Sequence, residues 1–256
     1  MKKTGLYCLL IAWFCIWTAF PAFADPKEIT VSAAMSLKNA FEDIGRLYES
    51  STGTTCVFNF GASGDLLKQI SGGAPVDVFA SAAKKDMDEA DRQGLTIAGT
   101  RTDFALNSVV LIVPVGAKTD LKSFEGLKAM EIQKIAVGNP KSVPAGRYAE
   151  DVFTFYNILS SLKDKFIYTE NVRQVLDYVA RNEVDAGVVY ATDAAARLKE
   201  VKIAATAPES SHQPVVYPVA LVKGTKNESD AKAFIALVLS DQGRAVLQKY
   251  GFKSNQ

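Results

Sequence analysis

Histidine and cysteine are scarce in this sequence. Among 256 residues there is one histidine, His212, and there are three cysteines. Cys8 and Cys15 lie in an N-terminal leader that we expect to be removed on export, so Cys56 alone remains and no internal disulfide can form. One histidine and one cysteine are too few to assemble a zinc site of the usual composition.

These two residues have ordinary structural explanations. His212 lies in the polar turn Pro-Glu-Ser-Ser-His-Gln-Pro, which favours a surface loop over a general base. Cys56 opens the apolar, β-prone run Cys-Val-Phe-Asn-Phe, which predicts a buried strand residue rather than a reactive thiol. Neither residue indicates catalysis.

The motifs of common enzymes are also missing. Gly61-Ala62-Ser63-Gly64 approaches a nucleophile elbow, but Asp65 stands where the last glycine belongs. No glycine-rich loop ends in Gly-Lys-Ser or Gly-Lys-Thr, as phosphate-binding loops do. The acidic run 86–89 falls in a predicted helix and indicates a solvated face. We therefore expect no enzyme, with a hydrolase or transferase on the same fold as the alternative that turnover assays would reveal.

The first 24 residues have the features of a secretory leader. Lys2 and Lys3 form a charged start, residues 6–20 are almost wholly apolar, and Ala22-Phe23-Ala24 predicts cleavage after Ala24. The apolar run of about 15 residues is shorter than the roughly 20 that span a bilayer. The aromatic residues before Cys15 match a lipoprotein cleavage box poorly. We expect an exported, periplasmic protein without a lipid anchor.

The charge of the mature chain argues against nucleic acid as a partner. Removal of Lys2 and Lys3 leaves 27 Lys and Arg against 28 Asp and Glu, so the formal net charge changes from +1 to −1. A nucleic-acid-binding domain usually carries a clear basic excess.

Strand and helix patterns alternate along the mature chain, which indicates α/β layers with mostly parallel sheets. The predicted strands are 28–32, 54–60, 76–81, 107–114, 135–137, 166–168, 185–190, 202–205 and 215–222. The clearest predicted helices are 37–50, 64–72, 84–93, 144–162, 172–182, 227–239 and 241–250.

The length allows one large domain or two small ones, and no linker or repeat divides the chain. Segments 107–114 and 215–222 are long and β-rich, with no obvious helix immediately before them. Two crossover strands that join lobes side by side would have this pattern. We predict a terminal lobe of 25–106 plus 217–256 and a central lobe of 107–216.

Several helix starts follow strand ends and carry small or hydroxyl side chains. In Gly-Asn-Pro-Lys-Ser-Val-Pro-Ala-Gly-Arg-Tyr (138–148), Pro144 fits the first helical position and leaves the following N–H groups open. Each helix N-terminus offers unpaired N–H groups and about half a positive charge, so four together would match a dianion without Lys or Arg. The proposed donors are Ser36, Ser63, Ala145 and Val172 at helix starts, with Tyr190 at a strand end.

Each of these residues alone has a simpler explanation. A serine at a helix start is most often an N-cap, and a tyrosine at a strand end is most often packed. Ala145 and Val172 alone carry no information. The prediction of an anion site therefore depends on the combination.

Longer stretches of the chain resemble periplasmic molybdate-binding proteins, the solute receptors of ABC importers. The stretches are Val-Ser-Ala-Ala-Met-Ser-Leu-Lys-Asn-Ala-Phe (31–41), Gly-Ala-Pro-Val-Asp-Val-Phe-Ala-Ser-Ala (73–82), Val-Gly-Asn-Pro-Lys-Ser-Val-Pro-Ala-Gly-Arg-Tyr-Ala (137–149), Glu-Asn-Val-Arg-Gln-Val-Leu (170–176) and Tyr-Pro-Val-Ala-Leu-Val-Lys (217–223). The resemblance covers nearly all of the mature chain. It differs at Ser63, where the family's loop is often serine-rich and this one is Gly-Ala-Ser-Gly.

The resemblance implies a type II periplasmic-binding-protein fold, with two lobes that close on a tetrahedral oxyanion. It implies that Ser36 and Ser63 donate by hydroxyl and backbone, Ala145 and Val172 by backbone N–H, and Tyr190 by its phenol. The metal is then held only through its oxygens, with no cofactor. The implied partners are molybdate or tungstate and a membrane permease, for a receptor expected to be a monomer. A receptor for another oxyanion or a ferric complex stays open as an alternative.

Overall fold

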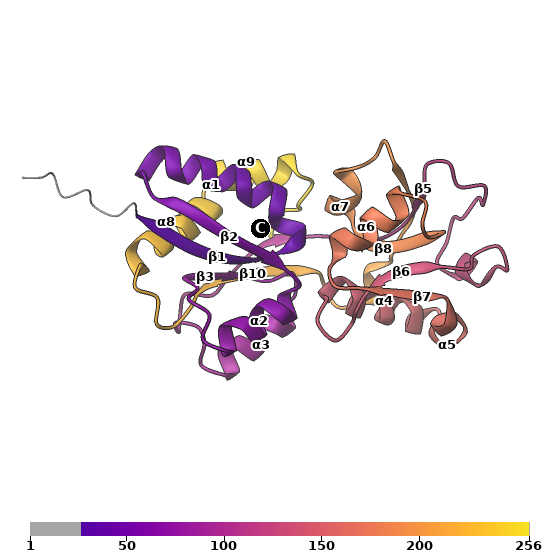
Figure 1. The fold of residues 1–256 in the computed structure, drawn as a ribbon, viewed down its shortest axis with the longest axis horizontal. Helices are drawn as coiled ribbons and strands as arrows, with labels where there is room; N and C mark the ends of the chain where they lie inside the picture. The colour runs from indigo at the N-terminus through magenta and orange to yellow at the C-terminus, as the bar shows by residue number, and fades with distance from the viewer. Residues whose placement is uncertain (1–26, 256) are drawn as a thin grey trace, which may run out of the picture.

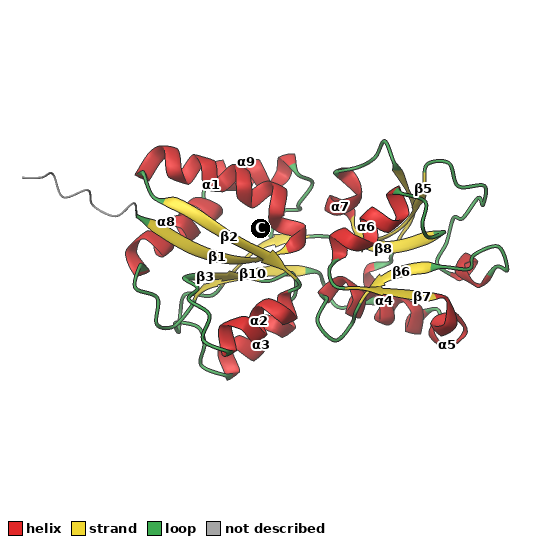
Figure 2. Ribbon diagram, viewed as in Figure 1, coloured by secondary structure: helices red, strands yellow, loops and turns green. Residues whose placement is uncertain are grey.

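The computed structural model describes residues 27–255, which form two α/β lobes side by side (Figure 1). The predicted leader and its cleavage site lie outside the described residues. Each lobe contains one five-stranded sheet with helices on both faces (Figure 2).

The first sheet has the strand order β2-β1-β3-β10-β4. Its strands are β1 (Glu28–Ala34), β2 (Thr55–Gly61), β3 (Val78–Ala80), β4 (Thr102–Leu106) and β10 (Val216–Leu221). Its helices are α1 (Lys38–Thr52), α2 (Ser63–Ser71), α3 (Lys84–Arg92), α8 (Glu228–Leu239) and α9 (Asp241–Lys249), with the short 3-10 helix η1 (Met35–Leu37) before α1. The lobe therefore combines both ends of the described chain.

The second sheet has the order β7-β6-β8-β5-β9 and is built from the middle of the chain. Its strands are β5 (Val109–Pro114), β6 (Ile135–Gly138), β7 (Phe166–Thr169), β8 (Ala186–Tyr190) and β9 (Val201–Thr206). Its helices are α4 (Pro144–Phe155), α5 (Leu159–Leu162), α6 (Val172–Ala180) and α7 (Ala191–Ala195), with the 3-10 turns η2 (Glu125–Lys128), η3 (Lys163–Lys165) and η4 (Glu209–Ser211).

Both sheets are mixed, whereas the sequence pattern predicts mostly parallel ones. In each sheet three strands are parallel, and a strand beside a crossover joins them antiparallel: β10 pairs with β3, and β5 pairs with β8. The crossover strand enters from the neighbouring lobe and runs against the parallel set. Every residue of β5 and β10 is buried, as expected of strands covered on both faces.

The chain passes between the sheets at residues 107–108 and again at 207–215. These crossings lie close to the predicted boundaries, although Val216, predicted in the central lobe, pairs with Leu106 of β4 in the first sheet. We keep the terms terminal lobe, for the part around the first sheet, and central lobe, for the part around the second. The two crossings are themselves bonded, because the Asn107 N–H donates to the Val215 carbonyl at 3.1 Å.

Local differences from the predicted elements have local causes. The predicted helix 144–162 is interrupted after Phe155, because Asn157 adopts a left-handed conformation with φ 53° that a continuous helix does not allow. The strand β4 and the short helix α7 have no counterpart among the predicted elements. Cys56 lies on β2 as predicted but is only half-buried, and burial raises the pKa of its thiol to about 12.

Candidate functional site

A small cavity lies between the lobes, and all five predicted donors line it. None of its lining side chains is charged, so any anion there would be held by neutral donors. The lining residues are Ala34, Met35, Ser36, Gly61, Ala62, Ser63, Ala82, Val143, Pro144, Ala145, Asn171, Val172 and Tyr190.

Ser63 begins α2 directly after β2 and is fully buried. Its Oγ accepts a hydrogen bond of 3.0 Å from the backbone N–H of Ala82. A hydroxyl that accepts from one side keeps its own proton for another acceptor. Ser63 is therefore set as a donor next to the cavity.

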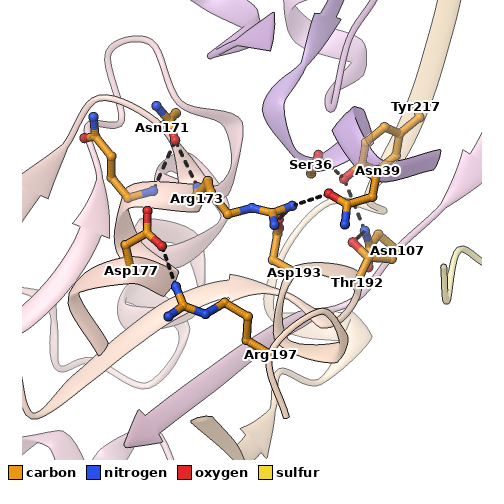
Figure 3. Close-up of polar contacts among 11 residues, drawn as sticks. Ser36, Asn39, Asn107, Asn171, Arg173, Asp177, Thr192, Asp193, Arg197 and Tyr217 are labelled. Atoms are coloured by element: carbon orange, nitrogen blue, oxygen red, sulfur yellow. Dashed lines mark hydrogen bonds and ion pairs between the residues drawn. The ribbon is translucent and has the colours of Figure 1, made fainter. Parts of the chain in front are cut away.

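Ser36 lies in η1, between β1 and α1, and is also buried. Its Oγ is 2.9 Å from the phenol oxygen of Tyr217 on β10. The Asn107 amide in turn donates to that phenol oxygen at 3.2 Å and to Thr192 Oγ1 at 2.8 Å (Figure 3). The second hydroxyl of the site is thus the end of a buried polar chain.

The central lobe supplies backbone donors. Pro144 is the first residue of α4, as predicted, and the backbone N–H of Ala145 makes no hydrogen bond within residues 27–255. The loop before it is tied to Asn139, whose carbonyl accepts from the N–H groups of Ser142 and Val143. Gly146 is needed behind this start, because a Cβ there would lie 1.9 Å from the Gly138 carbonyl oxygen.

The start of α6 follows the same principle. The Asn171 side chain caps the helix and accepts from the N–H groups of Arg173 and Gln174. The N–H of Val172 is left without a partner in the described chain and lies at the cavity. The cap thus pairs the second and third N–H groups of the helix and leaves the first one unpaired at the cavity, with the positive end of the helix dipole behind it.

Tyr190 closes the cavity from the end of β8 and is almost fully buried. Its phenol donates to the Ala82 carbonyl of the terminal lobe over a long 3.3 Å. Burial raises its pKa well above the ordinary value, so the phenol stays protonated and keeps its donor role at neutral pH.

Two further contacts cross the cleft between the lobes. The Gly64 N–H donates to the Ser142 carbonyl at 3.0 Å, and a Cβ on Gly64 would lie 2.8 Å from that oxygen. Arg147 of α4 forms an ion pair with Asp86 of α3.

The prediction of a solvated face for 86–89 is wrong for Asp86, which is buried. Burial raises the pKa of its carboxyl, while Arg147 opposes that shift. Its partner lies 61 residues away, so a local charge pattern could not indicate the pair.

A second buried pair lies behind α6. Arg173 is 3.5 Å from Asp193 of α7, and the same guanidinium donates to Asn39 Oδ1 of the terminal lobe at 3.4 Å (Figure 3). Both carboxylate oxygens of Asp193 are buried without a hydrogen-bond partner among the described residues. Burial raises the pKa of this carboxyl to about 6, and Arg173 only partly opposes the shift.

The other residues considered from the sequence lie outside the cavity. His212 is half-buried, and its ring packs against Tyr148 with centroids 5.6 Å apart. Over residues 27–255, no group of three or more His, Cys, Asp or Glu side chains could hold a metal ion. The same part of the chain contains no helix long and apolar enough to span a bilayer.

Sequence reasoning missed Asn107, Tyr217 and Thr192. Tyr217 lies in one of the stretches on which the family resemblance depends, but as a strand residue it gave no indication of a polar role. Asn107 lies between β4 and β5, two residues before the buried strand β5 begins. The polar residue at this junction was the one indication that the sequence offered.

Two α/β lobes that enclose a small donor-lined cavity define a solute receptor. Residues 29–253 match the description of bacterial extracellular solute-binding proteins, and the chain belongs to this family.

Relatives cover nearly the whole chain. The molybdate-binding protein ModA of Escherichia coli is 39% identical over 241 residues, 90% of this chain and 91% of ModA. The "Putative ABC transporter substrate-binding lipoprotein YvgL" of Bacillus subtilis is 42% identical over 225 residues, 88% of this chain and 85% of that protein. Among solved structures, the periplasmic molybdate-binding protein of Azotobacter vinelandii matches with a TM-score of 0.79 and 26% identity, covering 89% of this chain and all of the other.

Proposed function

We propose that this chain is an extracytoplasmic receptor that binds molybdate in the cavity between its lobes and delivers it to the membrane permease of an ABC importer. The observation that carries the proposal is the lining of that cavity, where five potential donors from both lobes meet without a charged side chain. The proposed ligand-binding residues are Ser36, Ser63, Ala145, Val172 and Tyr190. The names of the relatives support molybdate as the ligand.

The donor set suits a fully deprotonated oxyanion. Each hydrogen bond to a charged acceptor contributes about 1.5–3 kcal/mol, and closure of the lobes strengthens it by excluding water. Tungstate has nearly the same size and charge as molybdate, so the cavity binds both. Sulfate is smaller and would leave donors stretched or unpaired, at about 1–3 kcal/mol for each one.

Native mass spectrometry of protein purified without added oxyanion tests the ligand directly, because a retained ligand reports its own mass. Calorimetric titration then compares molybdate, tungstate, sulfate and phosphate. We expect one molybdate or tungstate per chain, and we expect the protein to be a monomer. Sulfate binding within tenfold of molybdate, a difference of about 1.4 kcal/mol, contradicts the proposed selectivity.

Substitutions locate the site. Ser63→Ala removes a cavity hydroxyl, and we expect affinity to fall about tenfold to a hundredfold. Ser50→Ala is the matched control, since Ser50 is an exposed serine of α1 whose hydroxyl donates to the Leu47 carbonyl of its own helix. Equal affinities of the two variants would place the ligand elsewhere.

The export part of the proposal has a separate test. Cleavage after Ala24 gives a mature chain that begins at Asp25, and the mass of the protein isolated from the periplasm measures this. A mass that includes the leader or an added lipid contradicts it.

A further inference from the structure

We infer that Asn107 is a positioning residue, which acts through Tyr217 to fix the Ser36 hydroxyl as a donor to the bound anion. The inference rests on the proposed function and adds a residue that does not line the cavity. Asn107 is buried at the first crossing between the lobes, between β4 and β5. It contacts both lobes, through Tyr217 on β10 and Thr192 on α7 (Figure 3).

The orientation of the Asn107 amide follows from its neighbours. The backbone N–H of Ser108 lies 2.9 Å from Asn107 Oδ1, and a peptide N–H can only donate, so this side of the amide is the acceptor. The amide nitrogen then faces Thr192 Oγ1 and the phenol oxygen of Tyr217. Both of its protons are used, and a turned amide would lose the Ser108 bond and set its NH2 group against that N–H.

This orientation sets the direction of the next two bonds. The Tyr217 phenol accepts from Asn107, so its single proton is free for Ser36 Oγ at 2.9 Å. Burial raises the pKa of Tyr217 well above the ordinary value, so the proton is present at neutral pH. Ser36 then accepts from Tyr217 and directs its own proton to the cavity. In the reverse order, a lone pair of Ser36 would face the anion.

The Ser63 hydroxyl has the same arrangement, but its donor is a backbone group rather than a side chain. Ser63 accepts from the Ala82 backbone N–H, which is fixed by the chain itself. The donor direction of Ser36 depends instead on two side chains that substitution can change. Asn107 is therefore the point where a residue outside the cavity should alter recognition of the anion.

The test is a set of double-mutant cycles on molybdate affinity, measured by calorimetry. Asn107→Leu removes the donors at similar size, and Tyr217→Phe removes the phenol oxygen. We expect each to weaken binding about threefold to thirtyfold in the wild-type background and less than twofold in a Ser36→Ala background, because the effect passes through Ser36. Asn59→Leu is the control: its amide bonds Gln69 in the same lobe and it does not line the cavity.

Asn107→Asp keeps the size of the side chain and the Ser108 contact but replaces the inward nitrogen by an acceptor oxygen. Tyr217 would then donate to residue 107, and Ser36 would turn its proton away from the anion. We expect a larger loss than for Asn107→Leu, with only the part due to charge repulsion persisting in the Ser36→Ala background. Because Asp is isosteric with Asn, this variant decides the question even if Asn107→Leu folds poorly, as melting of the unliganded protein shows.

Equal losses with and without Ser36 would make Asn107 a structural residue and overturn the inference. Affinity within twofold of wild type for both Asn107 variants would do the same. A wild-type protein that binds sulfate in place of molybdate would overturn the proposed function, and the same cycles with sulfate would still decide the role of Asn107.

Discussion

The two lobes have the same sheet plan but provide different kinds of donor. In both, three parallel strands are followed by an antiparallel strand next to a crossing, in the orders β2-β1-β3-β10 and β7-β6-β8-β5. The donors come from matching places. Ser36 and Ser63 follow β1 and β2 in the terminal lobe, and Ala145 and Val172 follow β6 and β7 in the central lobe.

The difference between a hydroxyl and a peptide N–H has a physical consequence. A hydroxyl turns freely, so each serine of the terminal lobe needs another donor behind it to set its direction. A peptide N–H at a helix start already points along the helix axis. The central lobe therefore needs only a cap that leaves this first N–H unpaired. We therefore expect the donors of the terminal lobe to be altered by substitutions behind the cavity, and those of the central lobe by changes of the backbone.

The largest effect is expected for Val172→Pro, which removes a donor of the central lobe. Proline is accepted at the first position of a helix, and the extended conformation of Asn171, with φ −158° and ψ 168°, suits the residue before it. The helix should persist while the N–H is lost, and we expect affinity to fall about a hundredfold. Val172→Ala is the control, since it keeps the N–H. Equal affinities of the two variants would show that no ligand bond is made here.

Tyr190→Phe removes the side-chain donor of the central lobe and keeps the aromatic packing. We expect calorimetry to show a loss of about tenfold to a hundredfold, or about 1.5–3 kcal/mol, while the unliganded protein melts almost unchanged. The single phenol proton is donated to the Ala82 carbonyl across the cleft in this structure, so it must leave that long bond to reach the anion. Affinity within a factor of two of wild type would make Tyr190 a packed aromatic.

Asp193→Asn tests the support behind the central-lobe donors. The folded pKa of about 6 lies above the ordinary 3.8, so the folded protein binds this proton more tightly than the unfolded chain does. Its stabilising contribution is full below about pH 4 and is lost as pH rises through 6. Between pH 5 and 7 we expect the free energy of unfolding of wild type to fall by about 1 kcal/mol relative to the variant. Denaturant titrations at both pH values measure this, and parallel pH profiles contradict the assignment.

The smallest effect is expected for His212→Ala. The ring lies beside Tyr148, away from the cavity, and none of the proposed donors titrates near neutrality. Molybdate affinity should stay within twofold of wild type across about pH 6–8. A strong, pH-dependent loss in a folded variant would require another site.

Local patterns predicted what depends on neighbours along the chain. Pro144 marked the start of α4, and the apolar runs around 109–114 and 216–221 marked buried strands. The strand β4 was missed because Thr-Asp-Phe-Ala-Leu is short and polar at its start, and it becomes a strand by pairing with β10 more than 100 residues later. The Asp86–Arg147 pair and the polar chain from Asn107 to Ser36 also depend on long-range contacts. The predicted site residues met at one cavity because each lies at or just after the carboxyl end of a strand.

The position of β10 also sets an order of assembly. Within its sheet β10 lies between β3 and β4, so β4 has no neighbouring strand until residues 216–221 have been synthesised. The central sheet uses only strands from 109–206 and can close earlier. A chain shortened to residue 214 should therefore keep a protease-resistant central lobe and a digestible terminal segment, as mass spectrometry of the fragments would measure. The Ser36 hydroxyl would then gain its Tyr217 partner only after the last part of the chain has been synthesised.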